Sequence, residues 1–180
     1  MKVYIFLADG FEEIEAIAPI DIFRRAKIEV ITISISNNKT VSGSHGILVI
    51  ADSLFSEADF NDNDMLYLPG GKLGTENLDA HEGLKDLISK QTLENKKLAA
   101  ICAAPSILGK MGILNGKEAI CYPGFENKLQ GAILSENKIV KSGNIYTAKG
   151  AGVAVQFALK LVEELKGSEL AQQIADSIRI

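Results

Sequence analysis

The chain has 180 residues, of which 47% are hydrophobic and 23% charged, as is typical of a globular protein with its own core. A net charge of -4 argues against a nucleic-acid-binding surface, which needs clustered lysines and arginines. No apolar run approaches the roughly 18 residues that a membrane-spanning helix needs. We therefore expect neither nucleic acid nor membrane as a partner. We expect a single domain over residues 1–180, because no linker, repeat or low-complexity tract divides the chain.

Only two cysteines occur, Cys102 and Cys121, and neither belongs to a CxxC pair. Two cysteines are too few for a disulfide framework, so we expect free thiols and a cytoplasmic location. The first residues predict a strand and not a signal peptide, because acidic residues follow the apolar run without a small-residue cleavage site.

The first half of the chain alternates strand-like and helix-like segments. Residues 2–8 are a continuous apolar run of strand length, and 12–26 have helical spacing with a proline inside that is expected to bend the helix. Residues 28–35 are β-branched and predict a strand, and 40–52 predict a hairpin that turns at "SGSHG". Residues 64–71 predict a strand that ends in a pair of glycines.

The second half continues the alternation. Residues 81–95 predict a surface helix, 96–102 a strand, and 104–112 a helix with a proline near its first turn. The remaining predicted elements are strands at 117–123, 138–140 and 145–149 and helices at 152–165 and 168–178. Such alternation indicates an α/β fold with a largely parallel sheet. Parallel sheets bind ligands at the carboxyl ends of their strands, where Asp9-Gly10, "LPGG" (68–71) and Cys102 are expected.

Cys102 falls at a predicted junction between a strand and a helix. Amides at a helix N-terminus favour an anion and lower the pKa of a thiol, and small neighbouring alanines permit a tight turn. The residue at such an elbow is often strained and exposed above the sheet. A free cysteine is equally well a buried core residue, so the sequence pattern leaves both interpretations open.

Two further features are expected near Cys102. Gly70 and Gly71 permit a close backbone approach, and the amides of Gly71 and Ala103 could form an oxyanion hole, although an ordinary turn fits the glycines equally well. Glu15 is expected to face the same sheet edge. If it is partly buried and protonated there, it could donate a hydrogen bond to a thiolate and lower the pKa of Cys102. The alternative is a solvent-facing acid.

The other acids and both histidines carry no such expectation. Glu12 and Glu13 are expected to be solvated at a helix N-terminus, and His45 and His81 to lie on the surface, with His45 possible at a subunit interface. No spacing indicates a metal site, and the P-loop and GxGxxG patterns are absent, so we expect no metal and no cofactor.

Four segments together resemble the ThiJ/PfpI superfamily, and most closely its DJ-one (Parkinson-disease protein) branch. They are "ADGFEEIEAIAPIDIFRRA", "YLPGGKLGTENL", "AAICAAPSIL" and "AKGAGVAVQFALKLVEEL", and the resemblance covers essentially the whole chain. It implies a flavodoxin-like three-layer α/β sandwich, with a mostly parallel central sheet flanked by helices, and a homodimer. It also implies that Cys102 is a reactive, easily oxidised elbow cysteine with Glu15 as its carboxyl partner and Gly71 and Ala103 as amide donors.

The chain departs from the family pattern at Tyr122. In many members a histidine stands at this position, in the segment that matches "ICYPGFENKL". Tyrosine, with an ordinary pKa near 10, is a poor base at neutral pH, which argues against a cysteine peptidase and against fast glyoxalase turnover. Oxidation of Cys102 needs only an accessible thiolate and is unaffected.

The resemblance implies a protein of stress protection that acts on small reactive aldehydes, as a cofactor-independent glyoxalase or deglycase. The alternative is a non-catalytic sensor of peroxide or a chaperone-like dimer that signals through oxidation of Cys102. A cysteine peptidase ranks lower, and a role in thiamine biosynthesis rests only on an old family label. The family arrangement predicts dimerisation through the first helix and residues 40–50, to which Asp21, Arg24 and Arg25 could contribute.

Overall fold

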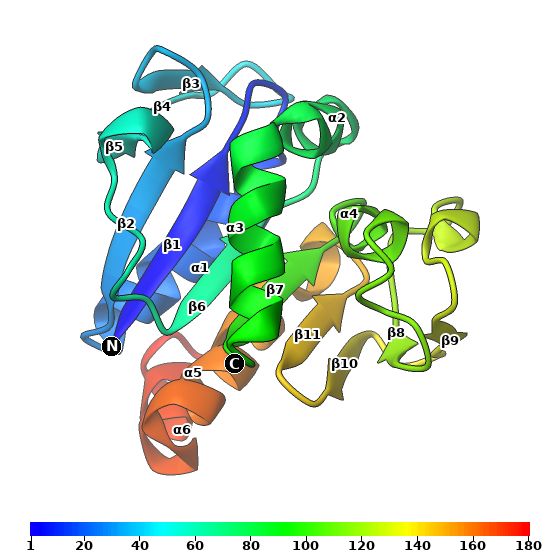
Figure 1. Cartoon of the computed structure of the whole chain (residues 1–180). Coiled ribbons are helices and arrows are strands. Elements are labelled where there is room, and N and C mark those ends of the chain that lie inside the picture. The colour runs from blue at the N-terminus through cyan, green and yellow to red at the C-terminus, as the bar shows by residue number, and fades with distance from the viewer.

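The computed structural model describes all residues from 1 to 180 and is built around a seven-stranded sheet (Figure 1). The strands lie, from one edge of the sheet to the other, in the order β10 (Ile139–Ser142), β11 (Ile145–Ala148), β7 (Lys97–Ile101), β6 (Met65–Leu68), β1 (Lys2–Leu7), β2 (Glu29–Ser34) and β5 (Ser53–Leu54). Within this sheet, only β10 and β11 pair in antiparallel fashion. The prediction of a mostly parallel α/β sheet is therefore confirmed.

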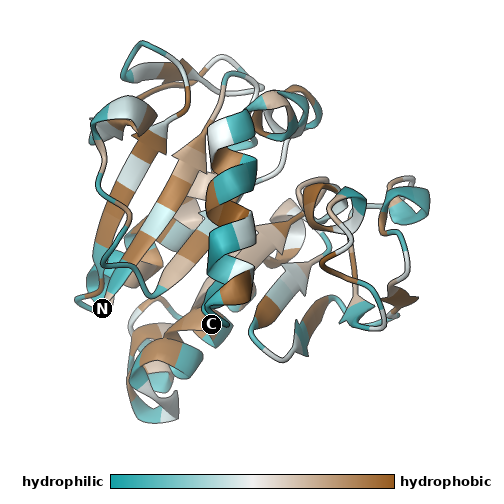
Figure 2. Ribbon diagram, in the orientation of Figure 1, coloured by the Kyte–Doolittle hydropathy of each residue, from teal (hydrophilic) through white to brown (hydrophobic).

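The central strands are apolar on both faces, which is why they read as continuous apolar runs in the sequence. Side chains along a strand point alternately to opposite faces. In β1, Val3, Ile5 and Leu7 belong to one core cluster, whereas Tyr4 and Phe6 belong to the other. Figure 2 shows the hydrophobic strands between helices that carry both hydrophobic and hydrophilic residues. Helices must therefore cover both faces.

The helices form the two outer layers. The first cluster is completed by side chains of α1 (Glu13–Arg25), α5 (Ala154–Lys166) and α6 (Ser168–Ser177). The second is completed by α2 (Lys72–Ala80), α3 (Glu82–Leu93) and α4 (Pro105–Lys110). This three-layer arrangement confirms the predicted sandwich.

Smaller elements lie around the sheet. The predicted hairpin is confirmed, with β3 (Thr40–Ser42) and β4 (Leu48–Ile50) paired in antiparallel fashion. Three short 3-10 helices are η1 (Phe55–Glu57), η2 (Glu126–Lys128) and η3 (Ala151–Val153). No helix in the structure combines the length and the apolar character needed to span a membrane.

Several short segments differ from the sequence prediction, among them β5 and β9 (Ile133–Leu134), where no strand was expected. Helix α2 was not predicted, because its nine residues contain a glycine and too few apolar positions to show helical spacing. The strand predicted over 117–123 is wrong in extent. Only β8 (Glu118–Ala119) forms, paired with β9 (Ile133–Leu134) in a separate sheet, and the chain then turns so that Tyr122 N–H reaches the carbonyl of Cys102.

The topology reverses direction at β1, which pairs with β2 on one side and β6 on the other. The loops that follow β1, β6 and β7 therefore leave the same sheet edge next to one another. Such a reversal is the usual ligand position of open parallel sheets. These loops carry Phe11 and Glu12, then Gly70 and Gly71, and finally Cys102.

Candidate functional site

Cys102 lies at the elbow between β7 and α4, with its side chain half-buried. Its φ of +64° is in the left-handed region, which a non-glycine residue rarely adopts. Two hydrogen bonds hold this backbone: Cys102 N–H donates to the Ala148 carbonyl (2.9 Å), and the Cys102 carbonyl accepts from Tyr122 N–H (2.8 Å). A strained residue that its surroundings fix in this way is characteristic of functional sites.

The residues after Cys102 are small and fully enclosed. Ala103 and Ala104 are buried, and Pro105 begins α4, where its missing N–H removes no helical hydrogen bond. The amide of Ala103 and the amide of Gly71, from the neighbouring loop, both act on the sulfur of Cys102 and lower its pKa. Two N–H donors from different loops therefore converge on one sulfur.

Glu15 lies in the first turn of α1 with its side chain directed into the protein. Only 1% of the residue is exposed. Its carboxyl accepts a hydrogen bond from Gly70 N–H (2.9 Å), and Glu15 Oε2 lies next to the Cys102 side chain, on the other side of Gly70. The solvent-facing alternative for Glu15 is thereby excluded.

The backbone of Glu15 is also held. Tyr67, a fully buried residue of β6, donates its hydroxyl proton to the Glu15 carbonyl over 2.9 Å. The Glu12 carboxylate caps the helix by accepting from Glu15 N–H over 2.8 Å. The position of the Glu15 carboxyl is therefore fixed by both the helix start and the sheet.

The glycine pair is required by the space that it occupies. A Cβ at Gly70 would lie 2.5 Å from Glu15 Oε2 and 2.6 Å from Cys102 Cβ, so no larger residue fits between the two groups. Gly71 has a φ of +89°, and a Cβ there would be 2.7 Å from the amide nitrogen of Glu12. The interpretation of "LPGG" as an ordinary turn is insufficient, because both glycines lie in direct contact with the site.

Burial controls the protonation of Glu15. Transfer of a carboxylate away from water disfavours its charge, and this raises the pKa of Glu15 to about 7. The hydrogen bonds from Cys102, Gly70 and Ala151 act in the opposite direction but do not outweigh burial. The predicted increase is confirmed, and Glu15 can exchange a proton near neutral pH.

The pKa of the thiol differs from the sequence prediction. Burial, together with the nearby Glu15 charge, raises the pKa of Cys102 to about 12, whereas helix N-terminal amides and a protonated Glu15 had predicted a decrease. The amides of Gly71 and Ala103 do lower it, but desolvation is the largest effect. The effect of the Glu15 charge is present only while Glu15 is ionised, because a protonated carboxyl carries no charge. The protonation states of Glu15 and Cys102 are therefore coupled.

Tyr122 lies beside the site and is half exposed, at 51%. Its ring atom Cδ2 would be 3.3 Å from a Cβ on Gly150, and the same Cβ would be 3.8 Å from Glu15 Oε1. Tyr122, Gly150 and Ala151 also line a cavity of about 450 Å³. Tyr122 is therefore in the wall of a cavity that adjoins the site, although neither Cys102 nor Glu15 lines that cavity.

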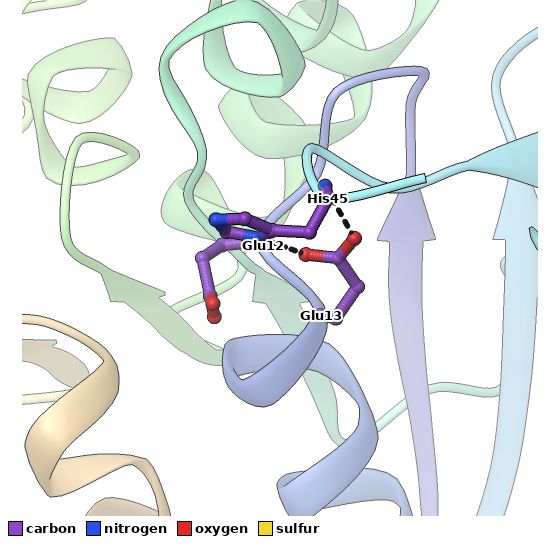
Figure 3. Close-up of side chains that lie close together, drawn as sticks. All are labelled: Glu12, Glu13 and His45. Atoms are coloured by element: carbon purple, nitrogen blue, oxygen red, sulfur yellow. Dashed lines mark hydrogen bonds and ion pairs between the residues drawn. The ribbon is translucent and has the colours of Figure 1, made fainter. Parts of the chain in front are cut away.

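The structure reveals a second cluster that the sequence analysis missed (Figure 3). Glu13 was expected to be solvated, but it is only 6% exposed. Its carboxylate accepts hydrogen bonds from the amide of His45 (2.6 Å), from His45 Nδ1 (2.7 Å) and from Ser44 Oγ (3.1 Å). These bonds lower the pKa of Glu13 to about 2 in spite of its burial, and the pair raises the pKa of His45.

The cluster attaches the β3–β4 hairpin to the start of α1, two residues before Glu15. Ligand-type atoms of Glu12, Glu13 and His45 lie within 4.8 Å of one another. Three donors already occupy the Glu13 carboxylate, so these residues form a structural clamp. No local signal connects positions 13 and 45. His81 also has a structural role, since its Nδ1 caps α3 by accepting from Leu84 N–H over 3.0 Å.

Fold and site together define a class: a parallel α/β protein with a strained cysteine at a strand–helix elbow, next to a buried carboxyl. The chain belongs to the DJ-1/PfpI family, whose family model matches residues 1–164. The resemblance that the four sequence segments indicate is thereby confirmed.

Individual relatives agree with this assignment. DJ-1 homolog B of Arabidopsis thaliana is 36% identical over 175 residues, which are 97% of this chain but 40% of that protein, so the chain spans less than half of that relative. A Pyrococcus abyssi protein named a deglycase is 30% identical over 168 residues, 92% of this chain and 100% of that protein. The solved structure of oxidised Toxoplasma gondii DJ-1 has a TM-score of 0.94 and 35% identity, covering 98% of this chain and 97% of that one.

Proposed function

We propose that this protein acts on small reactive carbonyl compounds, as a glyoxalase or deglycase that needs no cofactor and protects against carbonyl stress. The observation that carries the proposal is the adjacent pair of Cys102 and Glu15, which lies beside a cavity of about 450 Å³. A nucleophile needs a group that takes its proton, and a carboxyl with a pKa of about 7 does so at neutral pH. The name of the Pyrococcus abyssi relative supports the same class of reaction.

With methylglyoxal as substrate, the chemistry runs in three steps. The thiol proton of Cys102 passes to Glu15 as the sulfur adds to the aldehyde carbon, and the carbonyl oxygen takes up that proton to give a hemithioacetal. Glu15 then removes the hydrogen of this carbon as a proton and delivers it to the neighbouring carbon, which turns the adduct into a thioester of lactate. Water hydrolyses the thioester, so methylglyoxal and one water give one lactate and the free thiol.

The oxygen that becomes negative during addition needs donors. The amides of Gly71 and Ala103 both act on the sulfur of Cys102. The oxygen on the carbon that this sulfur attacks is therefore close enough to accept hydrogen bonds from the same amides. We assign these two amides the stabilisation of that oxygen.

Lactate formation from methylglyoxal tests the proposal. We expect lactate with the wild-type chain and none with Cys102→Ala, and a smaller rate with Glu15→Gln. Cys121→Ala is the matched control, since Cys121 is also a free thiol but lies in the core. Absence of lactate at high concentrations of the wild-type protein, or equal rates with Cys102→Ala, refutes the proposal.

A second function, peroxide sensing, is favoured by Tyr122, because oxidation of Cys102 does not need the histidine base that fast carbonyl turnover needs. The raised pKa of Cys102 leaves little thiolate and slows both reactions. The solved Toxoplasma gondii relative is an oxidised protein. In this function two peroxide molecules each transfer one oxygen to Cys102 and leave as water, so the thiolate becomes a sulfinate. Mass spectrometry after mild peroxide should show two added oxygens on Cys102. Oxidation of Cys121 first contradicts this function.

We also propose a homodimer formed through α1 and the β3–β4 hairpin. Five large apolar side chains of these elements are exposed: Ile14 (55%), Ile17 (41%), Ile47 (56%), Leu48 (66%) and Ile50 (76%). A monomeric protein rarely leaves such a group of side chains in water. Ile50→Lys should convert the dimer to a monomer in solution scattering, and a monomeric wild-type chain excludes the dimer.

The charged residues predicted for that interface have partners within the chain. Arg25 pairs with Asp21 over 2.6 Å, and Arg24 with Asp52 over 3.3 Å. The apolar side chains, and not these arginines, therefore carry the dimer proposal. Two free thiols fit a reducing compartment, and we propose the cytoplasm as the location.

A further inference from the structure

We propose that the cavity beside Cys102 is selective for carbonyl compounds that also carry an acidic group, a carboxylate or a phosphate, which Lys138 and Lys149 bind. This inference deepens the proposed function and rests on it for the identity of the reacting group. The cavity of about 450 Å³ is large enough for a small metabolite. Its walls determine which of the many reactive aldehydes it favours.

The cavity adjoins the reactive pair, although neither Cys102 nor Glu15 lines it. Tyr122, one of its wall residues, donates its amide to the carbonyl of Cys102. Gly150, another wall residue, lies close to both the Tyr122 ring and Glu15 Oε1. These wall residues therefore separate a molecule in the cavity from the reactive pair.

The charge of the cavity comes from two lysines. Lys138 and Lys149 both line it, and no aspartate or glutamate does. Their backbones are joined by a hydrogen bond from Lys149 N–H to the Lys138 carbonyl (2.9 Å), which keeps the two side chains at the same end of the β10–β11 pair.

Neither lysine is neutralised within the chain. Lys110 and Lys141 form ion pairs of 2.5 and 2.6 Å with Asp79 and Glu164, whereas Lys138 and Lys149 have no carboxylate partner. Two exposed, unpaired ammonium groups at one opening attract an anion, in a protein whose net charge of -4 otherwise repels it.

The acidic groups of the site, Glu12 and Glu15, are not among the residues that line the cavity. Both residues stand at the start of α1, and the charge of Glu12 raises the pKa of Glu15, which lies next to Cys102. An acidic group of a substrate is therefore repelled from the sulfur and attracted to the lysines. This polarity orients a molecule with its carbonyl toward Cys102 and its acid toward Lys138 and Lys149.

A pair of alkylating reagents tests the charge preference without any turnover. Iodoacetate is anionic and iodoacetamide is neutral, and both form the same thioether bond with Cys102 by displacing iodide. Peptide mass spectrometry gives the two rate constants at Cys102 alone. The rate constant with iodoacetate divided by that with iodoacetamide reports how strongly the surroundings of Cys102 favour an anion. The rate constant with iodoacetamide alone serves as a check that each variant is folded.

The variants are Lys138→Gln with Lys149→Gln, and a matched control, Lys27→Gln with Lys166→Gln. The control lysines are also exposed but lie outside the cavity, so both doubles change the net charge equally. In the variant that lacks Lys138 and Lys149, we expect the ratio of the iodoacetate to the iodoacetamide rate constant to fall by about 3- to 10-fold, the size of effect expected for two exposed charges. In the control variant the ratio should stay constant. High salt should reduce the wild-type ratio in the same way.

An unchanged ratio in the first double overturns the inference, and so does an equal fall in both doubles, since that is an effect of net charge only. The proposed function fails separately, through absence of carbonyl turnover, which leaves the alkylation ratio as it is. If turnover is present, 4,5-dioxopentanoate, an α-oxoaldehyde that carries a carboxylate, should lose more kcat/KM than methylglyoxal in the Lys138 and Lys149 double. Equal losses overturn the inference as well.

Discussion

The side chains of Glu15 and Cys102 lie next to each other at the carboxyl edge of the sheet, with no room for any residue but glycine at position 70 between them. One proton serves both groups. Burial raises the pKa of Glu15 to about 7, and the ionised carboxyl helps to raise the pKa of Cys102 to about 12. The reactivity of the thiol is thus controlled by a carboxyl that titrates near neutral pH.

Replacement of Glu15 by glutamine should make Cys102 more reactive toward a neutral reagent above pH 7. The substitution removes a negative charge that disfavours the thiolate, so the pKa of Cys102 falls. One unit of pKa corresponds to about tenfold more thiolate, and we expect at least about a tenfold faster reaction with iodoacetamide at pH 8. Site-resolved mass spectrometry measures this rate. Glu136→Gln, at an exposed position, should have no effect, and a slower reaction in Glu15→Gln contradicts the assigned coupling.

Replacement of Gly70 by alanine should destabilise the protein and separate the reactive pair. The new Cβ would lie 2.5 Å from Glu15 Oε2, so Glu15 or Cys102 must move. Overpacking of this kind destabilises by about 1–3 kcal/mol. Urea unfolding measures the loss. Gly152→Ala is the control, because a Cβ there meets no atom within 4 Å, and its stability should stay within about 0.5 kcal/mol of the wild type. Equal stability of the two variants is incompatible with the packing described.

The strain at Cys102 should reverse the usual order of glycine and alanine. At a φ of +64°, glycine avoids the steric conflict of a Cβ, which is worth about 1–2 kcal/mol. This gain is partly offset, because glycine loses more chain entropy on folding than alanine does. We therefore expect Cys102→Gly to be about 1 kcal/mol more stable than Cys102→Ala in urea unfolding. Neither variant should form lactate. Greater stability of the alanine variant would show that the elbow is relaxed.

The Glu13–His45 clamp should make stability depend on pH in a defined window. Glu13 has its pKa lowered from 4.5 to about 2, so its contribution is complete above pH 4.5 and is lost as the pH falls toward 2. His45 has its pKa raised, so its contribution is complete below pH 6.5 and declines as the pH rises through the raised value. The clamp is therefore strongest between about pH 5 and 6.

Glu13→Gln measures the clamp. We expect it to be about 1–3 kcal/mol less stable than the wild type near pH 6, because hydrogen bonds to a charged group are lost. This difference should shrink as the pH falls to 2. Urea unfolding at several pH values gives the profile, with Glu136→Gln as the control. A difference that is independent of pH would assign Glu13 a packing role only.

Tyr122→His should increase lactate formation from methylglyoxal by about a hundredfold, the contribution typical of a general base. Tyr122 is half exposed and its amide is bonded to the Cys102 carbonyl, so a histidine fits without disturbing the elbow. Pro123→Ala, in the same loop and cavity wall, is the control. Unchanged turnover in Tyr122→His would show that the tyrosine does not limit the reaction.

The sequence by itself determined most of the sheet and helices, because strands buried on both faces and helices with one apolar face have periods that are visible locally. It also indicated the edge where Glu15, Gly70, Gly71, Ala103 and Cys102 meet, since loops after parallel strands leave the sheet on one side. Helix α2 and the shortness of β8 were not visible, because their few residues take their conformation from what they pack against.

Only the tertiary structure decided the charge states of the site. Whether Glu13 is solvated or buried, and whether the pKa of Cys102 falls or rises, depends on water exclusion by segments distant in the sequence. His45 reaches Glu13 from a hairpin 32 residues away. Lys138 directly precedes β10 and Lys149 directly follows β11, and both line the cavity because this end of the strand pair lies beside Tyr122. Desolvation and proximity are properties of the packed chain, and no local pattern of residues encodes them.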